Sequence, residues 1–325
     1  MSGSITDVPG IEVGHAHDPA GGTGCTVVLC RRGAVPGVDT RGGAPATRET
    51  DCLRPENMLP VMHAVFLTGG SAYGLDCAGG IMRCLEEQGV GFQTGVAVVP
   101  IVAGAALNDL AFGNPRARPD AAMGYAACRS ASAGETRQGN VGAGMGACVG
   151  RLAGNARGMM KGGLGTASQR SGELVVGVIV AVNCNGDVLD PETGQTLAGT
   201  LTPDGKRIAG ARSLLLDPAG QYREGFPANT TIGVVATNAA LSKASATRVA
   251  MMAHDGYAHA IHPTHTLGDG DVIFCLGAGT LEADINRVGA LACWTMARAV
   301  ADAILAAESL HGVPSSKELL GRSRP

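Results

Sequence analysis

The sequence predicts an α/β fold. Apolar runs rich in β-branched residues, at 61–67 and 173–183, have the length of buried strands. Two later segments, 242–260 and 285–310, carry apolar residues at helical spacing. Hydrophobic residues make up 45% of the 325 residues, which is enough to fill one large α/β domain or two smaller ones.

In the first third, we expect residues 1–60 to be rich in loops, with a short strand at 25–30. The buried strand at 61–67 leads to Ser71, which we expect to cap a helix. A second buried strand is expected over 96–102. The helix between these strands has apolar residues at helical spacing and a glycine at its end, namely Leu75, Ala78, Met82, Leu85 and Gly89.

After a central strand at 173–183, the segment 188–222 is polar and turn-rich, and we expect it to be exposed. The pattern then changes to alternating strands and helices. Strands are expected at 230–237 and 271–276, and helices at 242–260 and 285–310. This β-α-β-α unit has the pattern of a distinct structural half.

The composition excludes several functions. A net charge of −3 and an aromatic content of 3% argue against a nucleic-acid partner, which requires excess Lys and Arg with interleaved aromatics. The longest apolar run, 174–182, is shorter than the roughly 20 residues that span a bilayer, so no membrane partner is expected. The first ten residues do not have the pattern of a signal peptide.

The ten cysteines are scattered singly and contain no C-x-x-C pair. They are typical of small buried hydrophobic residues in a reducing compartment, so we expect a cytoplasmic protein without a structural zinc site.

The segment 139–168 is the most glycine-dense part of a chain with 50 glycines. No register in it gives G-x-G-x-x-G, and Lys161 precedes its glycines instead of following them, so neither nucleotide-binding pattern is present. We interpret these glycines as sites where backbone closely approaches other backbone or a small substrate.

A metal site is one alternative. Four histidines precede two acidic residues, and imidazole and carboxylate are ligands for zinc or iron. The pair His262 and His265 flanks Pro263 in a loop, where metal-ligand spacing arises by chance, so solvent-facing or capping histidines are the simpler interpretation. The complete set is His254, His259, His262, His265, Asp269 and Asp271.

A second candidate is the junction Asn229-Thr230-Thr231, where a turn runs into a β-branched strand. A Thr hydroxyl can attack the carbonyl before it, which breaks the chain and frees an α-amine. That amine, with an ordinary pKa of about 7.7–8.0, then serves as the base for its own hydroxyl. Side chains alternate along a strand, so only Thr230 or Thr231 can face the pocket.

Seven blocks together carry a specific resemblance that covers about residues 5–310. They are GCTVVL (24–29), GVDTRGG (37–43), LTGGSAYGLDCAGG (67–80), GNVGAGMGACVG (139–150), MKGGLGTAS (160–168), NTTIGVVATNAAL (229–241) and HTLGDGDVIF (265–274). In this order the chain resembles the family of L-aminopeptidase/D-esterases, β-aminopeptidases and nylon-oligomer hydrolases.

The resemblance implies an α-β-β-α sandwich of the N-terminal-nucleophile type, made from a precursor that cleaves itself. The expected products are a large chain, 1–229, and a small chain, 230–325, which together form one structural domain. The cleavage site is Asn229–Thr230, and Thr230 is the nucleophile. By the same resemblance, Asn183 lies near the oxyanion, and Asp269 and Asp271 orient the amine and hydroxyl of Thr230.

Two residues depart from the family pattern. Asn108 stands where several members have a Tyr that helps hold the oxyanion, and Arg151 stands where many have Lys. Arg stays protonated at working pH, so Arg151 is not a proton acceptor, and both residues are assigned to substrate binding. Lys161 is a replacement for the missing Lys in catalysis or, equally, a structural ammonium that caps carbonyls. Tyr73 is assigned to the pocket lining, with a core position as the alternative.

The resulting prediction is an amide hydrolase or aminopeptidase that acts through an acyl-enzyme and requires no cofactor and no metal. Expected substrates are short peptides, amino-acid amides and ω- or β-amino acyl oligomers, and the expected assembly is a homo-oligomer of at least four chains. The alternatives are an uncleaved, catalytically silent binding protein and the His/Asp metal hydrolase.

Overall fold

One long strand organises the molecule. In the computed structural model, which describes residues 3–152, 158–217 and 229–321, strand β2 (Thr23–Thr40) is 18 residues long. The first part of β2 pairs with β1 (Glu12–Asp18) and β4 (Met62–Thr68), and its last part pairs with β16 (Val272–Leu281). The strand therefore belongs to two sheet layers.

The first layer continues from β4 to β7 (Val102–Ala106) and β3 (Thr47–Arg48). The second layer runs in the order β10 (Gly163–Ser171), β11 (Leu174–Val182), β14 (Ile232–Ala239) and β16. Its neighbours are antiparallel except for β14 and β16, which are parallel.

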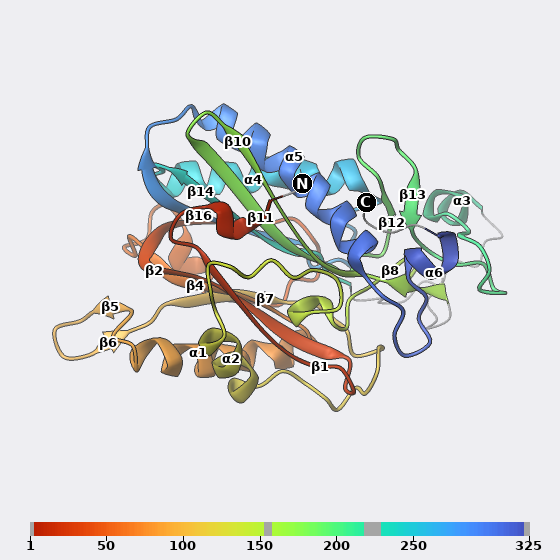
Figure 1. Cartoon of the computed structure of the whole chain (residues 1–325), viewed down its shortest axis with the longest axis horizontal. Coiled ribbons are helices and arrows are strands. Elements are labelled where there is room, and N and C mark those ends of the chain that lie inside the picture. The colour runs from red at the N-terminus through yellow and green to blue at the C-terminus, as the bar shows by residue number, and fades with distance from the viewer. Residues whose placement is uncertain (1–2, 153–157, 218–228, 322–325) are drawn as a thin grey trace.

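Helices cover the outer face of each layer (Figure 1). Helices α1 (Cys77–Glu86) and α2 (Ala121–Arg129) pack on the first layer, and α4 (Lys243–Ala260) and α5 (Ile285–Ala306) pack on the second. The predicted α-β-β-α sandwich is confirmed.

The alternation of side chains along each strand explains the layers. On β11, Val176, Val178 and Val180 join the apolar cluster under α4 and α5. Ile179 and Ala181 instead join the cluster between the two sheets. Strands buried on both faces read as continuous apolar runs, which is why 173–183 was recognisable from sequence.

The remaining elements are short. They are the 3-10 turns η1 (Ile5–Asp7), η2 (Asp51–Leu53), η3 (Ser71–Asp76) and η4 (Gly142–Gly144), strands β5 (Phe92–Gln93), β6 (Val98–Val99), β8 (Cys148–Val149), β9 (Met160–Lys161), β12 (Asp187–Leu189), β13 (Thr196–Ala198) and β15 (Ile261–His262), and helices α3 (Ala211–Leu216) and α6 (Ser316–Leu320).

Glycine lets the layers approach closely. A Cβ added at Gly165 on β10 would lie 2.0 Å from the carbonyl oxygen of Ala299 on α5. Within the glycine-dense segment, a Cβ at Gly144 would lie 2.2 Å from the backbone nitrogen of Leu164. Gly144 and Gly165 thus allow close backbone packing, which is the first of the two interpretations given above for the glycines of segment 139–168.

The elements predicted after residue 229 are present. Helix α4 begins after Ser242, whose side chain accepts a hydrogen bond from the Ser245 amide, and α5 ends at Ala306 rather than at 310. By length and hydropathy α5 alone, among the described helices, is apolar enough to cross a bilayer. It is a core helix instead, because 78% of its most apolar 18-residue stretch is buried in the protein.

The prediction for residues 1–60 was wrong. This region holds β1 and β2, and the predicted strand at 25–30 is only the first part of β2. Gly33, at φ +83°, lies where the pairing of β2 shifts register, and Pro36 follows it within the strand. These two residues interrupt the strand pattern in the sequence without ending the strand.

Two predictions near the first helix also need correction. Ser71 does not cap α1, because it lies at φ +55° at the start of η3, and α1 begins only at Cys77. The buried strand is β7, whereas much of the predicted segment 96–102 is an exposed hairpin in which Val96 is 95% exposed.

The segment 188–222 is less exposed than expected. Val188 on β12 and Leu197 and Ala198 on β13 are buried against the core beneath α5, although residues 218–222 lie outside the described part. Strand β10 and helix α2 were not predicted, because glycines dilute the apolar pattern of both. All ten cysteines are free thiols, and nine are buried, as expected for small hydrophobic residues.

Candidate active site

The candidate site lies at one end of the second sheet. Here β11 ends at Val182 and β14 and β16 begin, so Asn183, Asn229–Thr230 and Asp271 meet although they are far apart in sequence. The Thr230 amide donates to the carbonyl oxygen of Asn183 at 2.7 Å. Thr230 itself is only 3% exposed.

The intact peptide bond between Asn229 and Thr230 is held on both sides. The Asn229 amide donates to the Gly268 carbonyl at 2.9 Å, and the Gly270 amide donates to the Asn229 carbonyl oxygen at 2.8 Å. The Thr230 hydroxyl also donates to that oxygen. The carbonyl before Thr230 is therefore polarised by a backbone amide while the hydroxyl lies next to it.

Thr231 is placed differently. Its amide donates to Asp271 Oδ1 at 2.7 Å, and its buried hydroxyl has no hydrogen-bond partner among the described residues. Only Thr230 brings a hydroxyl to the Asn229 carbonyl, which favours Thr230 over Thr231 as nucleophile. The turn at 225–228, predicted to strain the junction, lies outside the described residues.

The carboxylate of Asp271 is fully engaged. Besides the Thr231 amide on Oδ1, its Oδ2 accepts from the Thr264 hydroxyl at 3.1 Å. The same oxygen accepts from the backbone amide of His265 at 3.1 Å and from Nδ1 of its ring at 2.8 Å. Asp271 thus joins the loop before β16 to the start of β14.

Asp269 holds the same loop from its other side. Its oxygens accept from the amide and side chain of Asn185 at 3.3 and 3.2 Å and from the amide and hydroxyl of Thr266 at 3.1 and 2.5 Å. Burial, followed by the nearby negative charge of Asp271, raises the pKa of the Asp269 carboxyl to about 6.

The role that the resemblance assigns to the two carboxylates, orienting Thr230, stays a prediction. In the described part of the chain, neither Asp269 nor Asp271 forms a hydrogen bond with the Thr230 hydroxyl. In this uncleaved form Asp271 binds the amide of Thr231, and Asp269 lies in the 268–270 loop, whose backbone binds Asn229.

Asn183, Asn108 and Arg151 form a connected polar group next to Asn229. The Asn183 side chain accepts from the Cys148 amide at 2.9 Å and donates to the Asn108 carbonyl at 3.3 Å. Arg151 Nη1 donates to the Asn229 side-chain oxygen at 2.8 Å and to the Asn108 carbonyl at 3.4 Å. Burial lowers the pKa of the Arg151 guanidinium.

Asn108 contributes its backbone to this group, because its side-chain oxygen accepts from the Leu110 amide and closes a local turn. Its side chain therefore does not replace the Tyr of the family pattern. The predicted binding residues Asn108 and Arg151 do lie at the site, together with the predicted oxyanion residue Asn183.

Of the two roles considered for Lys161, a catalytic lysine or an ammonium that caps carbonyls, its contacts are those of the second. Its ammonium is fully buried and donates to the carbonyl oxygens of Gly144, Ala147 and Gly162 at 2.9, 2.8 and 3.1 Å. These three bonds use all three of its N–H groups. Burial lowers its pKa to about 8.

Tyr73 is neither a core residue nor a partner of the residues at Thr230. It lies in η3 and is 58% exposed, with the Arg118 guanidinium 3.6 Å above its ring. Nothing in the described chain links it to Thr230.

The histidines do not form a metal centre. Within residues 3–152, 158–217 and 229–321, no group of three or more His, Cys, Asp or Glu side chains is arranged to hold a metal ion. His262 donates to the Ala258 carbonyl at 2.9 Å, and His265 is paired with Asp271. The metal-hydrolase alternative therefore has no structural support in this part of the chain.

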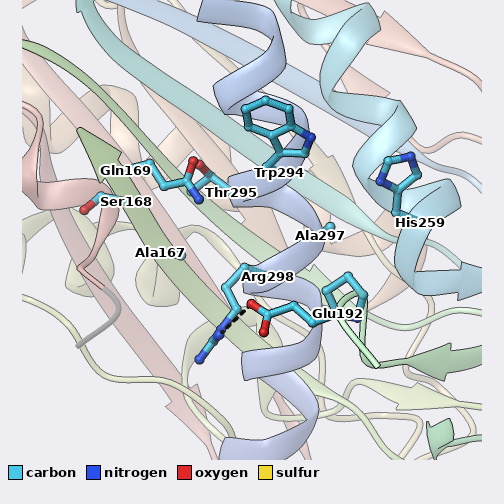
Figure 2. Close-up of a pocket in the computed structure, with 10 residues that line it drawn as sticks. Ala167, Ser168, Gln169, Glu192, His259, Trp294, Thr295, Ala297 and Arg298 are labelled. Carbon is cyan, nitrogen blue, oxygen red and sulfur yellow. Dashed lines mark ion pairs between the residues drawn. The ribbon is translucent and has the colours of Figure 1, made fainter. Parts of the chain in front are cut away.

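A cavity of about 530 Å³ lies away from this site, between β10 and α5 (Figure 2). Trp294 and Arg298 of α5, Gln169 of β10 and Glu192 line it, and Arg298 pairs with Glu192 at 3.6 Å. None of its lining residues belongs to the group around Thr230.

Two contacts at the site were not predicted. The Gly270 amide reaches the Asn229 carbonyl, and the His265 ring reaches Asp271. The sequence did offer a signal for the first, since Gly270 is a small residue between two acidic residues. The two interpretations of His265 from sequence, a metal ligand or a solvent-facing or capping histidine, did not include a pair with Asp271.

The chain is similar to known proteins over nearly its whole length. The sequence model of peptidase family S58 matches residues 3–317. An uncharacterized aminopeptidase of Mycobacterium leprae (strain TN) is 44% identical over 351 residues, which cover 96% of this chain and 92% of that protein. A 6-aminohexanoate-oligomer endohydrolase of Kocuria sp. (strain KY2) is 30% identical over 315 residues, which cover 91% and 84%.

Solved structures share the fold. The L-aminopeptidase D-Ala-esterase/amidase of Ochrobactrum anthropi, described as a variant of the Ntn hydrolase fold, gives a TM-score of 0.72 at 19% identity over 97% of this chain and 90% of that one. A β-aminopeptidase of Burkholderia sp. gives 0.67 at 21% identity over 99% and 94%. The predicted N-terminal-nucleophile fold is thus confirmed.

Proposed function

The chain belongs to peptidase family S58, and from this premise we propose that it is an amide hydrolase that cleaves itself before Thr230 and then uses Thr230 as its nucleophile. One observation carries the proposal. The Thr230 hydroxyl and the Gly270 amide both donate to the carbonyl oxygen of Asn229, and self-cleavage must attack the carbon of this carbonyl group.

Self-cleavage begins when Thr230 Oγ1 adds to the carbonyl carbon of Asn229. The Gly270 amide stabilises the negative charge that develops on the carbonyl oxygen. The hydroxyl proton passes to the leaving nitrogen of Thr230 as the C–N bond breaks, which gives an ester between Asn229 and Thr230. Water hydrolyses this ester and leaves a carboxylate on Asn229 and a free amine and hydroxyl on Thr230.

Hydrolysis of a substrate repeats these steps between molecules. The α-amine of Thr230 takes the hydroxyl proton as the oxygen attacks the amide, and gives it to the departing amine. Asn183 donates to the substrate oxyanion after its side chain exchanges the Asn108 carbonyl for the substrate. Water then releases the acyl group. Asp269 and Asp271 keep the nucleophile in place, and Lys161 supports the glycine-rich loop.

The names of the relatives support the proposed substrate class. One is named an aminopeptidase and another a 6-aminohexanoate-oligomer endohydrolase, which supports short peptides, amino-acid amides and ω- or β-amino acyl oligomers as substrates. We further propose a cytoplasmic homo-oligomer of at least four copies, in keeping with the high apolar content and the scattered free cysteines.

The test is the size of the purified protein and the sequence at the new amino terminus. Chains of about 23 and 10 kDa are expected from the 32.6 kDa precursor, and the small chain should begin at Thr230. Thr230→Ala should give a single chain without amidase activity, whereas Thr231→Val should still cleave. A small chain that begins at Thr231, or an active enzyme without a small chain, would refute the proposal.

A further inference from the structure

We propose that His265 is a positioning residue for Thr230, acting through Asp271, an inference that rests on the function proposed above. The His265 ring donates from Nδ1 to Asp271 Oδ2 at 2.8 Å, and the other oxygen of that carboxylate accepts the Thr231 amide at 2.7 Å. A continuous chain of hydrogen bonds therefore joins the imidazole to the residue next to the nucleophile.

The backbone of His265 turns both its amide and its ring toward Asp271. His265 lies at φ +57°, a left-handed conformation that favours glycine and is unfavourable for a residue with a Cβ. In the conformation adopted, both the amide and the ring of His265 reach the same oxygen of Asp271.

The surroundings keep the ring in one orientation. Nδ1 donates to the carboxylate, and the other ring nitrogen, Nε2, is buried with no hydrogen-bond partner in the described chain. The His254 ring packs edge-on at 4.9 Å between centroids, and Tyr257 lies at 6.2 Å, both on α4.

Asp39, on β2, is a further charged residue near the rings of His254 and His265. From β2, the Asp39 carbonyl accepts from His254 Nε2 at 3.1 Å, and the Asp39 carboxylate lies 3.7 Å from the same nitrogen. Burial lowers the pKa of His254 to about 4, so His254 is neutral at pH 7 and does not compete with His265 for Asp271.

This chain of contacts matters because two consecutive amides anchor the nucleophile. The Thr230 nitrogen bonds to the Asn183 carbonyl, and the Thr231 nitrogen bonds to Asp271. After self-cleavage Thr230 is a chain end, and these two bonds remain on either side of its Cα. Rotation of the Asp271 carboxylate would release one of them and let the hydroxyl move. A misplacement of about 1 Å costs roughly 100-fold in rate.

His265→Gly separates this task from a purely structural one, because glycine suits φ +57° and relieves backbone strain. We expect kcat on alanine p-nitroanilide, counted per cleaved chain, to fall about 100-fold with KM nearly unchanged. Added imidazole should restore at least tenfold by entering the vacated space and donating to Asp271. His311→Gly is the matched control, since His311 has φ +51° and is exposed; it should keep the wild-type kcat.

An unchanged kcat in His265→Gly, or a loss that imidazole does not restore, would overturn the inference. Wild-type and Thr230→Ala proteins are assayed in parallel. If Thr230→Ala is active, the proposed function itself fails. If Thr230→Ala is inactive and the wild type is active, an unchanged kcat in His265→Gly refutes only the role of His265.

Discussion

The backbone amide of Gly270 donates a 2.8 Å hydrogen bond to the carbonyl oxygen of Asn229, the residue that precedes the proposed nucleophile, Thr230. The bond belongs to a short parallel bridge between Asn229 and the loop that leads into β16. A backbone donor already aimed at this oxygen requires no reorganisation when negative charge develops on it. In the proposed mechanism, self-cleavage and substrate hydrolysis use different oxyanion donors, Gly270 for the first and Asn183 for the second.

Gly270→Ala should slow self-cleavage. A Cβ at this position would lie 2.5 Å from the Ala44 carbonyl oxygen and 2.8 Å from Thr230 Oγ1, so either the loop or the nucleophile must move. We expect the cleavage rate to fall at least about tenfold, since a misplacement of about 1 Å costs such reactions roughly 100-fold. The measurement is the appearance of the small chain after synthesis, followed on denaturing gels.

Gly134→Ala is the control for Gly270→Ala, because a Cβ at Gly134 meets nothing within 4 Å. It should cleave at the wild-type rate. Equal rates for both variants would contradict the prediction, because they would mean that the added Cβ is accommodated without moving the Gly270 amide or Thr230 Oγ1 out of its reactive position.

The later half of the fold was predictable because each element has a clear period and end. Helix α4 has Ser242 as its cap, and β11 is a continuous apolar run. Strand β2 was not, since Gly33 and Pro36 look like loop residues when the bulge that accommodates them is unknown. Local patterns identify elements, whereas the path of a strand through two sheets depends on long-range pairing.

The sequence allowed us to predict which residues form the site but not how they contact one another. Motif resemblance singled out Thr230, Asn183 and Asp271, and the strand ends bring them together. The individual contacts were not predictable, because they depend on backbone groups such as the Gly270 amide and the Asn108 carbonyl. Lys161 shows the same limit, since only the structure shows which carbonyls surround its ammonium.

Lys161→Met should reduce stability and leave chemistry intact. The change removes three hydrogen bonds from a charged group, although the Ala147 carbonyl keeps the Gly162 amide at 2.9 Å and the Gly144 carbonyl keeps the Ala147 amide at 3.4 Å. We expect the free energy of unfolding to fall by about 3 kcal/mol, since a hydrogen bond to a charged group contributes about 1.5–3 kcal/mol and the lost burial cost of the ammonium offsets part of the total. The kcat per cleaved chain should stay within about twofold of wild type, since the ammonium does not touch Thr230.

The control for Lys161→Met is Lys206→Met, an exposed lysine whose loss should change the free energy of unfolding by less than about 0.5 kcal/mol. Urea unfolding and steady-state kinetics on the same preparations decide the matter. A large drop in kcat with normal stability would return Lys161 to a catalytic role.

The raised pKa of Asp269 predicts how stability changes with pH. Its carboxyl has a pKa of about 6 in the folded chain, against an ordinary value of 3.8. Between these two values the folded state binds a proton that the unfolded state does not, so this group makes the fold more stable as pH falls from about 6 to 4. The gain approaches about 1.4 kcal/mol per pH unit within that window.

Asp269→Asn removes this titration, and Thr230→Ala in both proteins keeps the chain in one piece. The free energy of unfolding of the protein that retains Asp269, relative to that of the Asp269→Asn variant, should therefore increase by about 1 kcal/mol between pH 7 and pH 5. Asp109 and Asp187, whose pKa values burial also raises, titrate alike in both proteins and cancel in this difference. Urea unfolding at the two pH values measures it. A relative loss of stability at pH 5 for the protein that retains Asp269 would mean that the hydrogen bonds from Asn185 and Thr266 outweigh burial and hold this pKa below its ordinary value.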